Sequence, residues 1–182
     1  MPALLVIDVQ EAFAARRDRG QLWANPGAEQ AIAALLAAFR RCGLPVIHVH
    51  HHGTDPADEF HRDAPGARVM ACAAPKAGEA VVIKTGSSAF IGTDLSERLA
   101  ALGNPALVIA GGAANYCINS TARMAGNLGH EVTIASDALI NFGQRLGDGR
   151  VMPAADVLAL TLADLDGEFG RVEPSGQIIA RL

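Results

Sequence analysis

Aromatic residues, cysteines and positive charge are all scarce in this 182-residue sequence. Aromatic side chains make up 4% of it, and three cysteines with no CxxC pair do not indicate a disulfide framework. The formal net charge of −4 gives no basic field that would attract nucleic acid or anionic lipid. No apolar run approaches the roughly 20 residues of a membrane-spanning helix. No charged leader precedes the first apolar run. We therefore expect one cytoplasmic domain over residues 1–182, with neither nucleic acid nor a membrane as a partner.

Short apolar runs alternate with helical segments along the whole chain. Continuous apolar runs predict buried strands at 4–7, 45–49, 80–83, 106–110 and 132–135, with a short last strand near Val172. Helices are predicted at 26–42, 93–102, 115–128 and 153–165, and Asn25 is expected to cap the first of them. The segments 9–24 and 50–78 are expected to be loops. This order predicts an α/β fold, a three-layer α-β-α domain around a mostly parallel, Rossmann-like sheet of about six strands.

Polar side chains follow several of the predicted strands at their carboxyl ends. Asp8 follows the first strand, Lys84 the third, the turn from Gly111 to Cys117 the fourth, and Asp137 the fifth. In open parallel sheets, ligands bind beyond these ends. Each residue alone has an ordinary explanation, such as a cap, a solvated charge or a packed thiol. Together they predict a functional site at one edge of the sheet.

Cys117, Asp8 and Lys84 supply the groups that a thiol nucleophile needs. Cys117 is near the start of a predicted helix, where the helix dipole and free amides favour the thiolate. Asp8 can act as the base, and Lys84 can hold and polarise it. The Gly-Gly-Ala turn before Cys117 lets backbone amides approach a developing oxyanion. These residues predict an enzyme in which Cys117 attacks a carbonyl carbon.

Several motifs are spaced along nearly the whole chain. In chain order they are Leu5-Val6-Ile7-Asp8-Val9-Gln10 with Phe13, Lys84 with Ser87-Ser88-Ala89-Phe90, Thr93 with Leu95, Gly111-Gly112-Ala113-Ala114-Asn115-Tyr116-Cys117, Thr121-Ala122-Arg123, Gly129, and Ser136-Asp137-Ala138. This series resembles the isochorismatase-like cysteine hydrolases, a superfamily that includes nicotinamidases and N-carbamoylsarcosine amidases.

The resemblance implies a catalytic triad of Asp8, Lys84 and Cys117. It also implies a cis peptide bond between Gly112 and Ala113, with the amides of Ala113 and Cys117 as the oxyanion site. Relatives commonly form dimers or tetramers, so a homo-oligomer is expected, and no cofactor is implied. Ala114 is a departure, because relatives often carry threonine at this position, and it leaves the identity of the small-molecule substrate open.

A cysteine nucleophile favours hydrolysis of a small-molecule amide or related C–N bond through a thioester. Cleavage of a vinyl ether, the reaction that names the superfamily, does not require a cysteine and stays as an alternative. A non-catalytic domain that only binds a small ligand is the other alternative. A dinucleotide-binding enzyme is disfavoured because no GxGxxG turn follows the first strand, and a serine hydrolase because GxSxG is absent.

Aromatic residues and histidines flank these positions in the sequence. Phe13, Trp23, Phe90 and Tyr116 are predicted to line a small pocket, which Phe142 is placed to reach. Five histidines crowd the segment after the second strand: His48, His50, His51, His52 and His61. No Asp stands two residues before a His, so the ligand pattern of metal-binding nicotinamidases does not transfer. Neighbouring histidines could still coordinate zinc, but we interpret them as loop or pocket-lining side chains and predict no metal site.

Overall fold

The central sheet has six strands in the order β3-β2-β1-β4-β5-β8, and every neighbouring pair in it is parallel. The computed structural model describes all of residues 1–182. The strands are Ala3–Ile7 (β1), Val46–His51 (β2), Ala80–Lys84 (β3), Leu107–Gly112 (β4), Val132–Ile140 (β5) and Arg171–Glu173 (β8). The predicted three-layer α/β fold with a parallel sheet of six strands is therefore confirmed.

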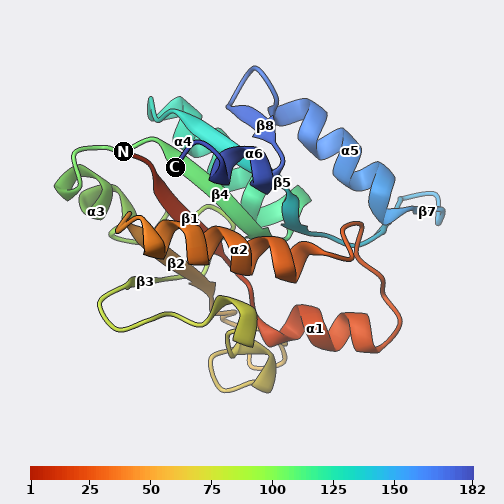
Figure 1. Ribbon diagram of the computed structural model, residues 1–182. Coiled ribbons are helices and arrows are strands. Elements are labelled where there is room, and N and C mark those ends of the chain that lie inside the picture. Colours follow the sequence, from red (N-terminus) through yellow and green to blue (C-terminus); the bar gives the residue numbers. More distant parts are fainter.

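Helices cover both faces of this sheet (Figure 1). One face carries α1 (Glu11–Asp18), α2 (Ala28–Arg41) and α6 (Ser175–Ile179), and the other carries α3 (Leu95–Ala101), α4 (Asn119–Asn127) and α5 (Ala154–Leu165). Two short 3₁₀ turns, Pro65–Ala67 (η1) and Ala71–Ala73 (η2), lie in the crossover from β2 to β3. A two-stranded hairpin of β6 (Gln144–Arg145) and β7 (Val151–Met152) precedes α5.

Strand β1 lies inside the sheet, between β2 and β4, and its side chains are buried on both faces. Leu4 and Val6 join the core cluster under α2, whereas Leu5 and Ile7 join the cluster under α3 and α4. Full burial of each such side chain contributes about 1.5–3 kcal/mol. This burial explains the continuous apolar run, and it places the next residue, Asp8, in the middle of the carboxyl edge of the sheet.

Four local predictions are wrong. Residues 50 and 51, expected to begin a loop, are the last two residues of β2. Residues 11–18 form helix α1 rather than part of a loop, with Glu11 in its first turn and two arginines in its last. Helix α2 begins at Ala28, and Asn25 does not cap it. The Asn25 side-chain amide donates instead to two carbonyl oxygens of β5, those of Ser136 at 2.9 Å and Leu139 at 3.0 Å. Strand β5 extends to Ile140, five residues beyond its predicted end.

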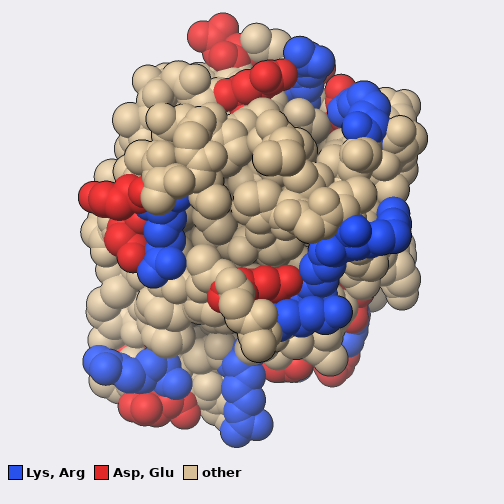
Figure 2. Space-filling view, turned by 60° about the vertical axis from the view of Figure 1, so that its left-hand side comes forward, with Lys and Arg blue, Asp and Glu red and all other residues tan.

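None of the helices combines the length and hydropathy that a bilayer crossing requires. On the face drawn in Figure 2, lysine and arginine side chains stand in small groups beside aspartate and glutamate side chains. That face carries no extended basic surface.

A partly buried ion-pair network fixes the amino end of β3. The Glu79 carboxylate accepts hydrogen bonds from Arg40 Nε at 2.6 Å and Arg40 Nη2 at 2.8 Å, and from the Lys76 backbone amide at 2.8 Å. It also contacts Nε2 of the fully buried His48 at 2.9 Å. The hydrogen bonds from Arg40 are the largest cause that lowers the pKa of Glu79 to about 2.

We expect Glu79→Gln to destabilise the protein at neutral pH and much less in acid. The pKa of Glu79 is lower in the folded protein than its ordinary value of 4.5, so its contribution is present above pH 4.5 and is lost as the pH falls toward 2. The shift corresponds to about 3 kcal/mol of unfolding free energy at pH 7. Urea denaturation at pH 7, 5 and 3 measures the gap between variant and wild type.

Glu131→Gln is the matched control, because Glu131 is exposed and its pair with Arg171 is long, at 3.4 Å. Its effect is expected to stay within about 0.5 kcal/mol at every pH. A gap between Glu79→Gln and wild type that stays constant from pH 7 to pH 3 would contradict the assigned network.

Candidate active site

Three chemically active side chains meet at the carboxyl edge of the sheet. Lys84 Nζ donates to Asp8 Oδ2 at 2.7 Å and to Cys117 Sγ at 3.2 Å. Asp8 and Lys84 are 2% and 1% exposed, and Cys117 is half-buried. The structure thus brings together the carboxylate, ammonium and thiol that the sequence places at the ends of three different strands.

The ends of β1 and β3 aim two of these side chains at each other. Asp8 follows β1 in the left-handed conformation, with φ at 51°, and its amide donates to the Val49 carbonyl of β2 at 2.8 Å. Aspartate tolerates this conformation better than most residues. Lys84 is the last residue of the edge strand β3, and its ammonium also donates to the carbonyl oxygen of Gly86 at 3.1 Å.

The last two residues of β4 have to be glycines. A Cβ on Gly111, whose φ is 123°, would lie 2.0 Å from the carbonyl oxygen of Ile7, and one on Gly112 would lie 2.5 Å from the Phe13 ring. The bond between Gly112 and Ala113 is cis. The Ala113 carbonyl accepts from the amides of Tyr116 and Ile118, but no hydrogen bond uses the Ala113 N–H.

Cys117 follows these residues in a single π-helical turn, Ala114–Ile118 (η3), that leads into α4. Burial raises the pKa of the Cys117 thiol to about 12; the negative charge of Asp8 adds to the shift and the ammonium of Lys84 opposes it. The prediction that Cys117 has a lowered thiol pKa is therefore wrong, because burial and the nearby carboxylate of Asp8 raise it.

Asp8 is the group next to the thiol that can accept its proton. Burial raises the pKa of the Asp8 carboxyl, against the opposing charge of Lys84. A raised pKa makes this carboxylate a stronger base. Its Oδ2 is held by Lys84, whereas its Oδ1 is buried without a hydrogen-bond partner. The arrangement leaves one carboxylate oxygen available for proton transfer.

The aromatic residues predicted to line a pocket do not form one wall. The ring of Phe13 packs against those of Phe60 and Phe142, with centroid distances of 5.2 and 5.8 Å. Phe142 in turn stacks on Trp23, with the ring centroids 6.3 Å apart. This cluster is mostly buried and reaches the site through Phe13, which packs on Gly112.

The other two predicted pocket residues lie apart from that cluster. Phe90 is 9% exposed. Its ring stacks on that of His130, which lies just before β5, with the centroids 5.8 Å apart. Tyr116 is 51% exposed, and its hydroxyl donates to Gln144 Oε1 in the β6–β7 hairpin at 3.1 Å. Tyr116 therefore links the nucleophile turn to the hairpin.

Asp137 has a structural role. Its two carboxylate oxygens accept from the Ser175 amide and the Ser175 hydroxyl, both at 2.7 Å, at the start of α6. The prediction that Asp137 follows the end of strand five is wrong, because β5 continues to Ile140. Asp137 thus lies inside a strand and ties α6 to β5.

The histidines divide between the two faces of β2. His48 and His50 lie on the face of α2, where His48 contacts Glu79, and no group of three or more His, Cys, Asp or Glu side chains is placed to hold a metal ion. His51 lies beside the site, with its Nδ1 3.4 Å from Lys84 Nζ.

Gln10 is a residue of the site to which sequence reasoning gave no role, and His51 is one that it treated only as a loop or pocket-lining histidine. The side chain of Gln10 is fully buried: its Oε1 accepts from the His51 amide at 2.8 Å, and its Nε2 donates to the His51 carbonyl at 2.9 Å. His51 stands directly opposite Lys84 in the register of β2 and β3. Extending strand two from Val49 to His51 would have revealed this neighbour.

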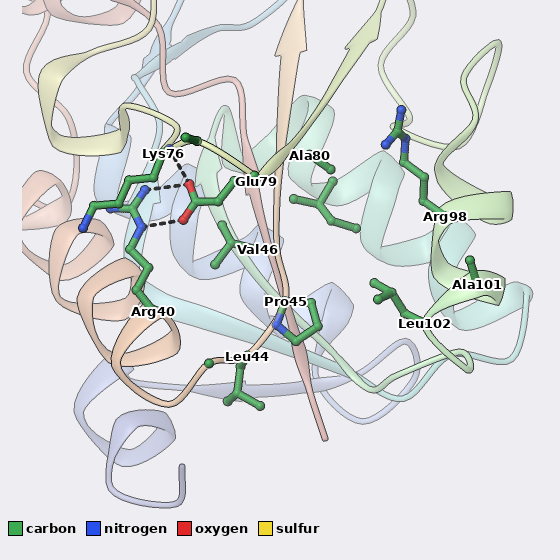
Figure 3. A pocket seen from close by; sticks show the side chains of 14 residues that line it. Arg40, Leu44, Pro45, Val46, Lys76, Glu79, Ala80, Arg98, Ala101 and Leu102 are labelled. Atoms are coloured by element: carbon green, nitrogen blue, oxygen red, sulfur yellow. Dashed lines mark hydrogen bonds and ion pairs between the residues drawn. The ribbon is translucent and has the colours of Figure 1, made fainter.

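A hollow with a volume near 700 Å³ lies at the other edge of the sheet, beside the amino ends of β2 and β3 (Figure 3). Arg40 and Arg98 stand on opposite sides of it, and each already pairs with a carboxylate, Arg40 with Glu79 and Arg98 with Asp94. No cysteine, serine, threonine or histidine lines it, so it lacks the thiol and the base that the carboxyl edge brings together.

Fold and geometry together define a parallel α/β domain with cysteine, carboxylate and ammonium groups clustered at the carboxyl edge of its sheet. The family model of the isochorismatase domain matches residues 2–148, and the chain belongs to this family.

Three relatives show how far the likeness extends. The isochorismatase family protein YrdC of Bacillus subtilis is 33% identical over 97% of this chain and 94% of its own. A crystal structure of an isochorismatase-family protein from Chromobacterium violaceum superposes with a TM-score of 0.93 and 41% identity, over 98% of this chain and 92% of that one. Maleamate amidohydrolase of Pseudomonas putida is 31% identical, over 94% of this chain and 82% of its own.

The thiol environment gives a test that needs no substrate. Because the pKa of Cys117 is near 12, wild-type alkylation by iodoacetamide should be slow at pH 7 and still rising at pH 9. Asp8→Asn removes a negative charge that raises this pKa, so Cys117 alkylation at pH 8 should become about 10-fold faster. Peptide mass spectrometry assigns the modified cysteine.

The exposed Cys42 is the internal reference, and its alkylation rate should be the same in both proteins. Rapid alkylation of wild-type Cys117 at pH 6, or slower alkylation after Asp8→Asn, would contradict this electrostatic description.

Proposed function

We propose that this protein is a cysteine hydrolase that cleaves a small-molecule amide or related C–N bond through a thioester intermediate. One observation carries the proposal: the Lys84 ammonium bridges Asp8 Oδ2 at 2.7 Å and Cys117 Sγ at 3.2 Å. Base, charge and nucleophile are then all within reach of one reacting carbonyl. The likeness to a maleamate amidohydrolase supports an amide as the substrate class.

In the proposed first step, the Cys117 thiol transfers its proton to Asp8 while Sγ attacks the carbonyl carbon. The carbonyl oxygen becomes an oxyanion, and the N–H groups of Ala113 and Cys117 are its proposed donors. The unused N–H of Ala113 supports this role. The Lys84 ammonium stabilises the negative charge that sulfur carries before the new bond is complete.

In the second step, the tetrahedral intermediate collapses and the C–N bond breaks. Asp8 returns the proton to the departing nitrogen, which leaves as ammonia or an amine, and Cys117 is left as a thioester. Asp8 then takes a proton from water, whose oxygen attacks the thioester carbonyl, and the sulfur regains a proton when the acid leaves. The overall change is amide plus water to acid plus amine. A cytoplasmic location and a homo-oligomer stay predictions.

A panel of small amides tests the reaction and its nucleophile. The panel includes amide monoacids, ureido acids and nicotinamide-like amides, with release of ammonia or amine as the readout. We expect wild type to hydrolyse at least one member, and Cys117→Ala to lower kcat by at least about 1,000-fold, since no other group can form the thioester. Acid-quenched mass spectrometry should find the acyl group on Cys117.

Cys42→Ala is the control, because Cys42 is exposed and lies at the end of α2. It should keep wild-type turnover, and circular dichroism should show that both variants fold. Wild-type turnover by Cys117→Ala would exclude this nucleophile, and an acyl group on another residue would reassign it.

A further inference from the structure

The Lys84 ammonium faces more hydrogen-bond acceptors than it has N–H groups to donate. Besides Asp8 Oδ2 and Cys117 Sγ, it faces the Gly86 carbonyl at 3.1 Å and His51 Nδ1 at 3.4 Å. An ammonium has three N–H donors for these four atoms. The Lys84 side chain is fully buried, so no solvent replaces a missing partner. The ammonium position therefore depends on which neighbours accept from it at each stage.

His51 is held in a fixed place beside this ammonium. Gln10 clamps its backbone with one hydrogen bond to the amide and one to the carbonyl, at 2.8 and 2.9 Å. The Phe60 ring packs against the imidazole with centroids 5.7 Å apart, edge to face. Backbone and ring are thus both restrained, and Nδ1 is the ring atom that faces Lys84.

We propose that His51 is a positioning residue, which accepts an N–H of Lys84 at Nδ1 and so holds the ammonium between Asp8 and Cys117. This inference rests on the proposed function. When Asp8 takes the thiol proton it loses its charge, and its hold on Lys84 weakens. His51 Nδ1 and the Gly86 carbonyl are then the neutral acceptors that keep the ammonium beside the sulfur.

This role requires a neutral imidazole with its proton on Nε2. The titratable groups that act on His51 are Lys84, Asp8, Asp58 and His52, and burial is the largest cause that lowers its pKa from 6.5, followed by the Lys84 charge. At neutral pH the ring is therefore neutral. In acid, protonation would turn Nδ1 into a donor facing a cation, and Lys84 would lose this contact.

Two substitutions of His51 separate an acceptor from mere packing. The Oδ1 atom of asparagine can accept where Nδ1 does but cannot be protonated, whereas leucine fills a similar volume without an acceptor. His51→Leu should lower kcat by about 10- to 100-fold, the equivalent of one hydrogen bond to a charged group. His51→Asn should stay within about threefold of wild type, because the acceptor remains. Its acid limb of kcat/KM should move to lower pH than in wild type.

A substrate-free measurement tests the contact itself in the wild-type protein. Nitrogen-15 NMR of the histidine rings, with the His51 signal assigned by its loss in His51→Asn, should show protonated Nε2 and unprotonated Nδ1 at pH 7. A proton on Nδ1 would overturn the inference, as would full kcat in His51→Leu or identical acid limbs in wild type and His51→Asn. Failure of the proposed function shows separately, as a wild type that hydrolyses none of the amides.

Discussion

The site depends on one interaction, the ion pair between Lys84 and Asp8. Both side chains are almost fully buried, and a buried charge is tolerated only when it is paired and hydrogen-bonded. The pair joins the end of the central strand β1 to the end of the edge strand β3, across β2. Removing either partner would leave an uncompensated charge. The arrangement of these three strands is therefore tied to the electrostatics of the site.

The rest of the local structure supports this pair. β2, which lies between the two strands, supplies His51 beside Lys84 and the Val49 carbonyl that receives the Asp8 amide. Gln10 follows Asp8 after one residue and fastens the end of β2 to the start of α1. At the opposite end of β3, Glu79 ties the strand to α2 through Arg40. The edge strand that carries Lys84 is thus anchored at both ends.

Sequence reasoning predicted the parts that follow from simple periodicity. Apolar runs identified all five long strands, and the rule that parallel strands end at one edge brought Asp8, Lys84 and Cys117 together. Helix α1 was missed because its apolar positions do not form a long stripe, although Glu11 at its start and arginines at its end fit the helix dipole.

The remaining errors concern long-range contacts, which local patterns do not encode. Asn25 looked like a cap, but its amide has partners more than a hundred residues away in β5. Asp137 looked like a polar residue of the site at the end of a strand, but it accepts two hydrogen bonds from Ser175, the first residue of α6. Closeness in the sequence was also a poor guide to the surroundings of Phe90. This residue follows Lys84 by six positions, yet its ring stacks on that of His130.

The high pKa of Cys117 and its proposed role as nucleophile are compatible because of charge conservation within the site. At rest, the buried group holds one carboxylate, one ammonium and a neutral thiol. After the proposed proton transfer it holds a thiolate, the same ammonium and a neutral carboxyl. The number of buried charges is the same in both states, so the desolvation that raises the pKa of an isolated thiol does not oppose the transfer.

What changes in the transfer is the distance of the negative charge from Lys84 Nζ, which is 2.7 Å to Asp8 Oδ2 and 3.2 Å to Cys117 Sγ. An ammonium held between the two acceptors lowers the energy of the thiolate state toward that of the resting state, in which the thiol keeps its proton, more than a mobile ammonium would. The position of Lys84, more than the intrinsic acidity of the thiol, then determines how readily the nucleophile forms.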